Sequence, residues 1–246
     1  MKNINDTKTA SFWMLLLGLV AAIARGFAYM LAVDEKGLLV RFHPCSVVLG
    51  ILCAAALILA LAQLKGKKSS GKWEDTFPSG KTSALGCLAM AVGIGLTVAS
   101  GNDPARGNLA ALWNVSGVLS ALGLVWAALS RMKGQKPFLP IYAVVCLFLA
   151  LHMVSRYQPW SGDPQVMDWI FSLFGAVGLT LCAYHLAAFA VDAGHRRTFR
   201  TVGMLTVFSC GATLLHTDYL WLYLGGLVWV FTALWDMAPA GKGEEG

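Results

Sequence analysis

Arg25 is the residue whose position in this sequence points most directly to chemistry. It lies inside an apolar stretch, about eight residues or roughly 12 Å of helix from the end of that stretch. An arginine at that depth in a membrane costs several kcal/mol and usually faces a partner or a water-filled cavity. Three interpretations stay open: a structural ion pair with an acid such as Asp168, a site for an anionic ligand, and a side chain that extends to the membrane surface.

Four further polar residues complete a candidate ligand-binding set with Arg25. The order of apolar runs and polar gaps places His152, Asp168 and His216 toward the same outer end of the molecule. Asn114 lies in the fourth apolar run. A cationic side chain beside such groups suits an anionic or zwitterionic solute, so these residues predict an outward-facing polar pocket.

The outer end also carries residue types that bind zinc, namely His43, His152, Asp168 and His216. No local spacing such as H-x-x-x-H occurs among them, so a metal site depends on the fold bringing them together. Histidines bonded to turns and water at the end of a bundle are the plainer alternative. The sequence assigns no cofactor.

Motifs for catalysis are absent. The sequence contains no P-loop, no Rossmann fingerprint and no convincing hydrolase motif. Its six cysteines include no C-x-x-C pair and no metal-binding spacing, so we interpret them as packing residues. No catalytic residue is predicted, and an enzyme is the less favoured class.

Long apolar runs must position all of these side chains. The 246 residues are 57% hydrophobic and only 13% charged, with a mean hydropathy of +0.63, whereas soluble domains carry about 25% charged residues. Runs of roughly 20 apolar residues can cross a ~30 Å hydrocarbon core. The runs are Ser11–Val33, Cys45–Leu64, Thr82–Ser100, Asn108–Ser130, Phe138–Arg156, Val166–Val191, Thr201–Leu215 and Tyr219–Trp235.

These runs predict an all-α, polytopic transmembrane bundle: eight helices in four tandem hairpins, forming one membrane domain over residues 1–246. Only His216, Thr217 and Asp218 separate the last two runs. One re-entrant element over Thr201–Trp235 would instead give seven crossings.

Basic residues predict the orientation. Of the 19 lysines and arginines, 14 fall in the N-terminal segment, every second gap and the C-terminal tail, and four fall in the other gaps. The positive-inside rule then places both termini, the loop 65–81 and the tail 237–246 in the cytoplasm, with a prokaryotic plasma membrane as the expected location. We expect the loop to be flexible, with Trp73 at the membrane interface. The net charge of +6 therefore reflects topology and contact with anionic lipid, not nucleic-acid binding.

Small residues spaced by four predict where helices approach closely. Gly18, Ala22 and Gly26 follow this spacing in the first run, and Ala89 and Gly93 follow it in the third. Such residues let helix backbones approach in lipid, within one molecule or across a homodimer.

Two classes of function lead the hypotheses, and a third stays open. The first is a small-solute transporter or ligand-binding membrane protein with an outward-facing polar pocket. The second is a sensor or assembly subunit that signals to a protein partner through the basic cytoplasmic loops. The third is a membrane-embedded, metal-dependent hydrolase that uses the outer histidines and Asp168.

Overall fold

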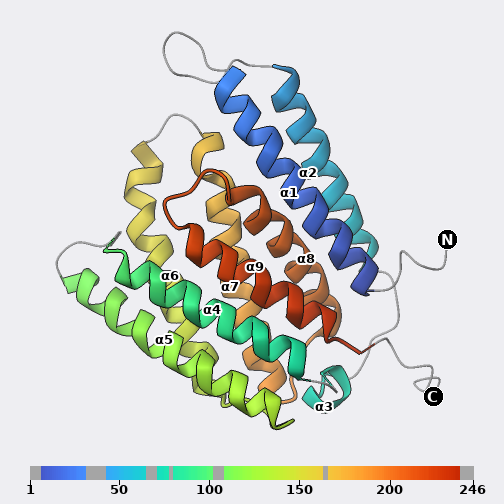
Figure 1. The fold of residues 1–246 in the computed structure, drawn as a ribbon. Helices are drawn as coiled ribbons and strands as arrows, with labels where there is room; N and C mark the ends of the chain where they lie inside the picture. The colour runs from blue at the N-terminus through green and yellow to red at the C-terminus, as the bar shows by residue number, and fades with distance from the viewer. Residues whose placement is uncertain are drawn as a thin grey trace.

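The computed structural model describes residues 7–31, 43–64, 71–77, 80–101, 108–162 and 166–238; residues 108, 157–162 and 166–168 are described as backbone only. Within these ranges the chain forms helices and no strands (Figure 1), which confirms the predicted fold class. The helices are α1 (Thr7–Leu31), α2 (Pro44–Ala62), α3 (Trp73–Thr76), α4 (Lys81–Ala99), α5 (Asn108–Met132), α6 (Leu139–Gly162), α7 (Val166–Ala190), α8 (Arg196–Thr213) and α9 (Leu220–Trp235).

Eight of these helices coincide with the eight apolar runs, whereas α3 was not predicted. The pairs α1–α2, α4–α5, α6–α7 and α8–α9 each pack together, as the four hairpins require. α8 and α9 are separate helices that contact one another, joined by the turn at residues 214–219.

Helices α1, α2, α4, α5, α6 and α7 are long and apolar enough to cross a membrane. Large apolar side chains such as Ile58, Leu122 and Trp126 point outward from them, as expected for a surface that faces lipid. The protein is therefore a multi-pass membrane protein.

Helices α8 and α9 occupy the middle of the bundle, between the α1–α2 hairpin and the α4–α5–α6 side (Figure 1). Because α8 is surrounded by protein, it can carry hydroxyl groups that bond its own carbonyls: Thr206 Oγ1 donates to Val202 O and Thr213 Oγ1 to Ser209 O, both at 2.8 Å. α8 is less apolar than the membrane-spanning helices because protein, and not lipid, surrounds it.

Glycines allow the closest contacts between helices. A Cβ atom at Gly18 would lie 2.9 Å from Phe208 O on α8, and one at Gly93 would lie 2.4 Å from Trp221 O on α9. Both are closer than a Cβ atom can approach, so these two predicted small-residue contacts are confirmed. Gly26 has no such neighbour within 4 Å, so the pattern does not extend to it.

The bundle has two chemically different ends. The turn end carries the α8–α9 turn, residues 214–219, and the α3 end carries α3 together with the starts of α1 and α8 and the end of α9. Lys8 Nζ lies 5.6 Å from the Trp235 ring centroid, so the first and last helices meet at the α3 end. The α3 end is the one that the basic residues predict to be cytoplasmic.

Candidate functional site

At the turn end, α1 buries Arg25 against α7 and α8. The side chain is 1% exposed, and its Nη1 donates to Ala212 O at 3.4 Å. Its guanidinium carbon lies 5.4 Å from the Phe171 ring centroid and 5.7 Å from that of Tyr29. A desolvated guanidinium gains about 2 kcal/mol from such cation–π contacts, so aromatic rings and a carbonyl stabilise part of its charge.

The predicted residues His216 and His152 lie at the same end as Arg25, in and beside the α8–α9 turn. His216 stacks on Tyr29, with ring centroids 4.0 Å apart and an interplanar angle of 17°. Tyr219 meets the buried His152 edge to face at 4.7 Å. It also lies 5.0 Å from the guanidinium carbon of Arg156, which pairs with Asp218 at 3.2 Å.

The remaining predicted residues have other positions. Asn114 donates to Ala110 O of its own helix at 3.0 Å, on α5, which packs against α4 and α6. His43 begins α2, where its Nδ1 accepts from Cys45 N at 3.4 Å. The Asp168 side chain lies outside the described part of the chain, so the Arg25–Asp168 pair stays a prediction.

Metal-ligand side chains do not cluster in the part of the chain that the structure describes. No group of three or more His, Cys, Asp or Glu residues there could hold a metal ion. Both ring nitrogens of His152 are buried and lack a hydrogen-bond partner among the described residues. His152 is thus a buried polar group at the turn end, packed against Tyr219.

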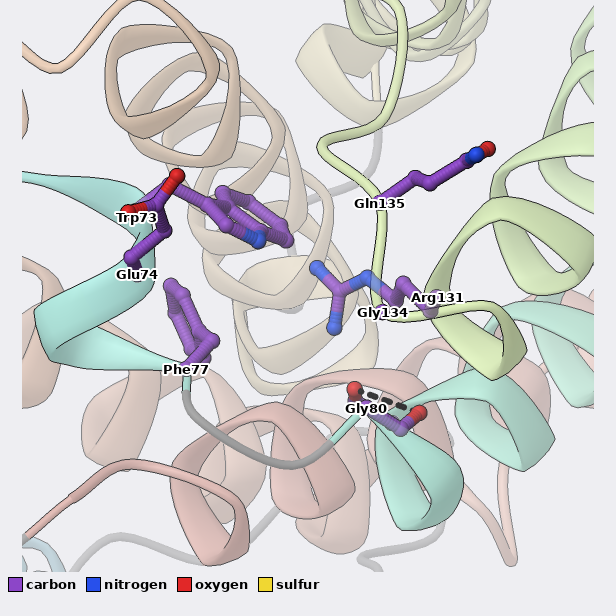
Figure 2. A pocket seen from close by; sticks show the side chains of 8 residues that line it. Trp73, Glu74, Phe77, Gly80, Arg131, Gly134 and Gln135 are labelled. Carbon is purple, nitrogen blue, oxygen red and sulfur yellow. Dashed lines mark hydrogen bonds between the residues drawn. The ribbon is translucent and has the colours of Figure 1, made fainter.

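At the α3 end, a second buried arginine forms a more complete site. Arg131 in the last turn of α5 is 2% exposed, and its Nη2 donates to Tyr142 Oη on α6 at 3.2 Å. The guanidinium carbon lies 4.9 Å from the Trp73 ring and 5.5 Å from the Phe77 ring. Figure 2 shows Arg131 reaching toward these two rings, while Gln135 points away.

A cavity of about 110 Å³ adjoins this guanidinium, lined also by Gly80, Ser83 and Glu74. Arg131 Nε and Nη1 are buried, and neither has a hydrogen-bond partner among the described residues. The ion pairs between described residues involve other groups. Two donor nitrogens, with three N–H bonds between them, therefore have no acceptor in the described chain.

Asp236 holds Ser83, one of the residues that line the cavity. Its carboxylate is 8% exposed, and Oδ2 accepts from Ser83 N at 2.6 Å, capping the first turn of α4 from the far end of the chain. Asp236 also acts on Arg131 electrostatically, without a direct pair.

Helix α3 closes the cavity because contacts from three other segments hold it. Asp192, in the left-handed conformation at φ 59°, accepts from Trp73 N at 2.8 Å and pairs with Lys136 Nζ at 2.6 Å. Gly194 N donates to Gly71 O at 3.3 Å, and Ala238 N donates to Thr76 O at 2.9 Å. Trp73 is 4% exposed, so the prediction of an interfacial tryptophan in a flexible loop is wrong for residues 71–77: the bundle end buries this side chain.

The Asp192–Lys136 pair is outside the membrane-spanning segments. Its hydrogen bond lowers the pKa of Asp192, helped by the bond from Trp73 N, and raises the pKa of Lys136. The contribution of Asp192 is present above the unfolded carboxylate pKa and is lost as pH falls through the lowered folded value. That of Lys136 is present below the unfolded ammonium pKa and is lost as pH rises through the raised value. The pair is therefore charged from about pH 4 to about pH 10.

Asp192→Ala is expected to release α3, because Trp73 N loses its acceptor and Lys136 loses its partner. Asp192→Asn keeps an acceptor and tolerates the left-handed backbone, so it should release α3 much less. Hydrogen exchange of peptides covering residues 71–77 measures the difference, and after correction for intrinsic rates it should be constant from pH 5 to 9. Equal exchange in the two variants and the wild type would show that Asp192 does not hold α3.

No family model, curated protein or solved structure matches this chain significantly.

Sequence reasoning missed the α3-end site. Arg131 follows an apolar run and precedes Lys133 and Lys136, so it counts as one more basic residue of a cytoplasmic gap. A usable signal was present in Trp73 and Phe77, an aromatic pair spaced by four inside a polar loop, which indicates a helical turn with an apolar face.

Proposed function

We propose that this membrane protein binds a small solute bearing a carboxylate or phosphate group, and that the Arg131 cavity is its binding site. One observation carries the proposal: the buried Arg131 lines a cavity, and two nitrogens of its guanidinium have no acceptor in the described chain. Leaving a buried donor unsatisfied costs about 1–3 kcal/mol, more for a charged group. An anionic oxygen would accept a charge-assisted hydrogen bond from either nitrogen, and such bonds are about twice as strong as neutral ones.

The surroundings of Arg131 favour such a ligand. Tyr142 and the rings of Trp73 and Phe77 fix the guanidinium before binding, which lowers the entropic cost of binding. The first turn of the 19-residue helix α4 borders the cavity, and a helix N-terminus favours negative charge. Glu74 at the cavity is 83% exposed in its side chain, so water screens its opposing charge.

The cavity lies at the end that the basic residues predict to be cytoplasmic, not at the expected outward-facing end. Its wall is α3, part of the basic loop 65–81, and bound ligand would contact this loop directly. This contact favours a ligand sensor that signals through the loops to a protein partner.

Transport of the anion is the second candidate. The observation in its favour is that a second arginine, Arg25, is buried at the opposite end of the same bundle. Together the two residues would offer an anion one cationic position near each membrane face.

Thermal unfolding of the detergent-solubilised protein in phosphate or acetate, against chloride at equal ionic strength, tests the binding proposal. A ligand at 100 times its Kd stabilises the folded state by about 2.7 kcal/mol. Arg131→Lys keeps the charge and removes the planar fork, so the affinity should fall about tenfold. Glu74→Gln removes an exposed opposing charge and should raise the affinity about two- to fivefold.

Arg156→Lys is the matched control, because this arginine pairs with Asp218 at the turn end. Its phosphate response should equal that of the wild type. The proposal fails if neither anion stabilises the protein, or if the Arg131→Lys and Glu74→Gln variants respond as the wild type does. Water alone would then fill the cavity.

A further inference from the structure

An apolar groove opens between α2, α7 and α8. Its volume is about 470 Å³, and its lining includes Leu57 of α2, Phe174 and Leu181 of α7, and Leu205 of α8. Leu57, Phe174 and Leu181 are also exposed on the outer surface of the bundle. Because α2 and α7 are membrane-spanning helices, the groove opens toward the hydrocarbon of the bilayer.

The groove has the length of a lipid tail. On α7 its lining extends from Ile170 to Leu181, which is about 16 Å at 1.5 Å per residue. This is about half of a ~30 Å hydrocarbon core. An apolar chain lying along the helices fits this shape, whereas a compact solute does not.

Positive charge gathers at the α3 end of the groove. Val202 of α8 lines the groove, and α8 begins just beyond it with Arg196, Arg197 and Arg200. Arg200 Nη2 donates to Gln63 O at the end of α2, so the arginines lie where two groove helices meet. Arg200 Nε is buried and has no hydrogen-bond partner among the described residues.

The positive charges of these three arginines lower the stability of helix α8. The start of α8 has no acidic residue in its first turn, and the His195 side chain does not cap it. Cations at the positive end of a helix dipole are unfavourable, as are like charges spaced by three or four residues. An anion beside Arg200 would offset both effects.

We infer that an anionic phospholipid binds here, with its phosphate at the start of α8 beside Arg197 and Arg200 and one acyl chain in the groove. The occupant must be apolar over about 16 Å and negative at one end. A neutral phospholipid lacks the net charge, and free phosphate lacks the chain. This site is independent of the Arg131 cavity, so either can exist without the other.

Native mass spectrometry and thermal unfolding in a nonionic detergent test the inference. Dioleoyl phosphatidylglycerol should bind and stabilise the protein at least about tenfold more strongly than dioleoyl phosphatidylcholine. Dihexanoyl phosphatidylglycerol should stabilise the protein much less than the dioleoyl lipid, because its short chains do not fill the groove. A membrane-surface arginine contributes about fivefold to the binding of anionic lipid, so Arg197→Gln should lower the phosphatidylglycerol affinity about fivefold.

Two further variants distinguish a specific lipid site from general attraction between anionic lipid and the positively charged end of the protein. Lys133→Gln removes a charge from another loop at the same end and should leave the affinity unchanged. Cys53→Trp fills the groove and should weaken binding of the long-chain lipid while the protein stays folded, because Cys53 is a half-buried lining residue. Equal binding of the two dioleoyl lipids, or equal losses in Arg197→Gln and Lys133→Gln, would overturn the inference. So would full stabilisation by the dihexanoyl lipid.

Discussion

Gly93→Ala is expected to lower the free energy of unfolding by about 1–3 kcal/mol, the usual cost of overpacking a tight core. A Cβ atom at this position would lie 2.4 Å from Trp221 O and 3.2 Å from Gly225 Cα. Both neighbours are backbone atoms of α9, so no side-chain rotation can relieve the clash. The two helices must separate along the contact between α4 and α9, where tight packing replaces lipid.

Gly95→Ala is the matched control for Gly93, two residues along the same helix. Nothing lies within 4 Å of its Cβ position, so alanine there should raise stability, by up to about 1 kcal/mol through helix propensity. Reversible unfolding of the purified protein in mixed micelles of increasing SDS content measures both changes. If the two substitutions have equal effects, backbone contact at Gly93 does not limit stability.

Gly225 on α9 faces Gly93, so substituting both residues tests whether their effects on stability are coupled. A Cβ atom at Gly225 would meet Ala89 O at 2.8 Å and Gly93 Cα at 3.2 Å. Once Gly93→Ala has separated the helices, Gly225→Ala should cost less than it does alone, because the same gap accommodates both methyl groups.

Asp236→Ala is expected to destabilise the protein by about 2–4 kcal/mol. The substitution removes a charge-assisted hydrogen bond to Ser83 N, leaves that buried N–H without an acceptor, and removes the acid that acts on Arg131. Asp236→Asn retains an oxygen acceptor and should cost about half as much. The same SDS titration measures the series.

Asp218→Ala is the control for loss of an aspartate in an ion pair. Its side chain is 70% exposed and pairs with Arg156, so the loss should be at most about 1 kcal/mol. A cost at Asp218 equal to that at Asp236 would contradict the view that burial and helix capping give Asp236 its importance.

The helices follow from the sequence because hydropathy is a local property. A run of roughly 20 apolar residues must be a helix in lipid, where each backbone N–H and C=O needs a partner within its own segment. The three polar residues His216, Thr217 and Asp218 were enough to divide α8 from α9. The basic gaps predict which end faces the cytoplasm by an equally local rule, which the fold leaves untested.

Only the tertiary structure placed a cavity beside Arg131. Arg25 stands out in the sequence because it interrupts an apolar run, and the fold covers it with Phe171, Tyr29 and a carbonyl. Arg131 is inconspicuous because it ends a run beside other basic residues. Its neighbours, Trp73 and Asp236, come from segments about 60 and about 100 residues away along the chain. Contacts of that range leave no local pattern, so the same charged side chain is a topology signal in the sequence and a candidate ligand site in the fold.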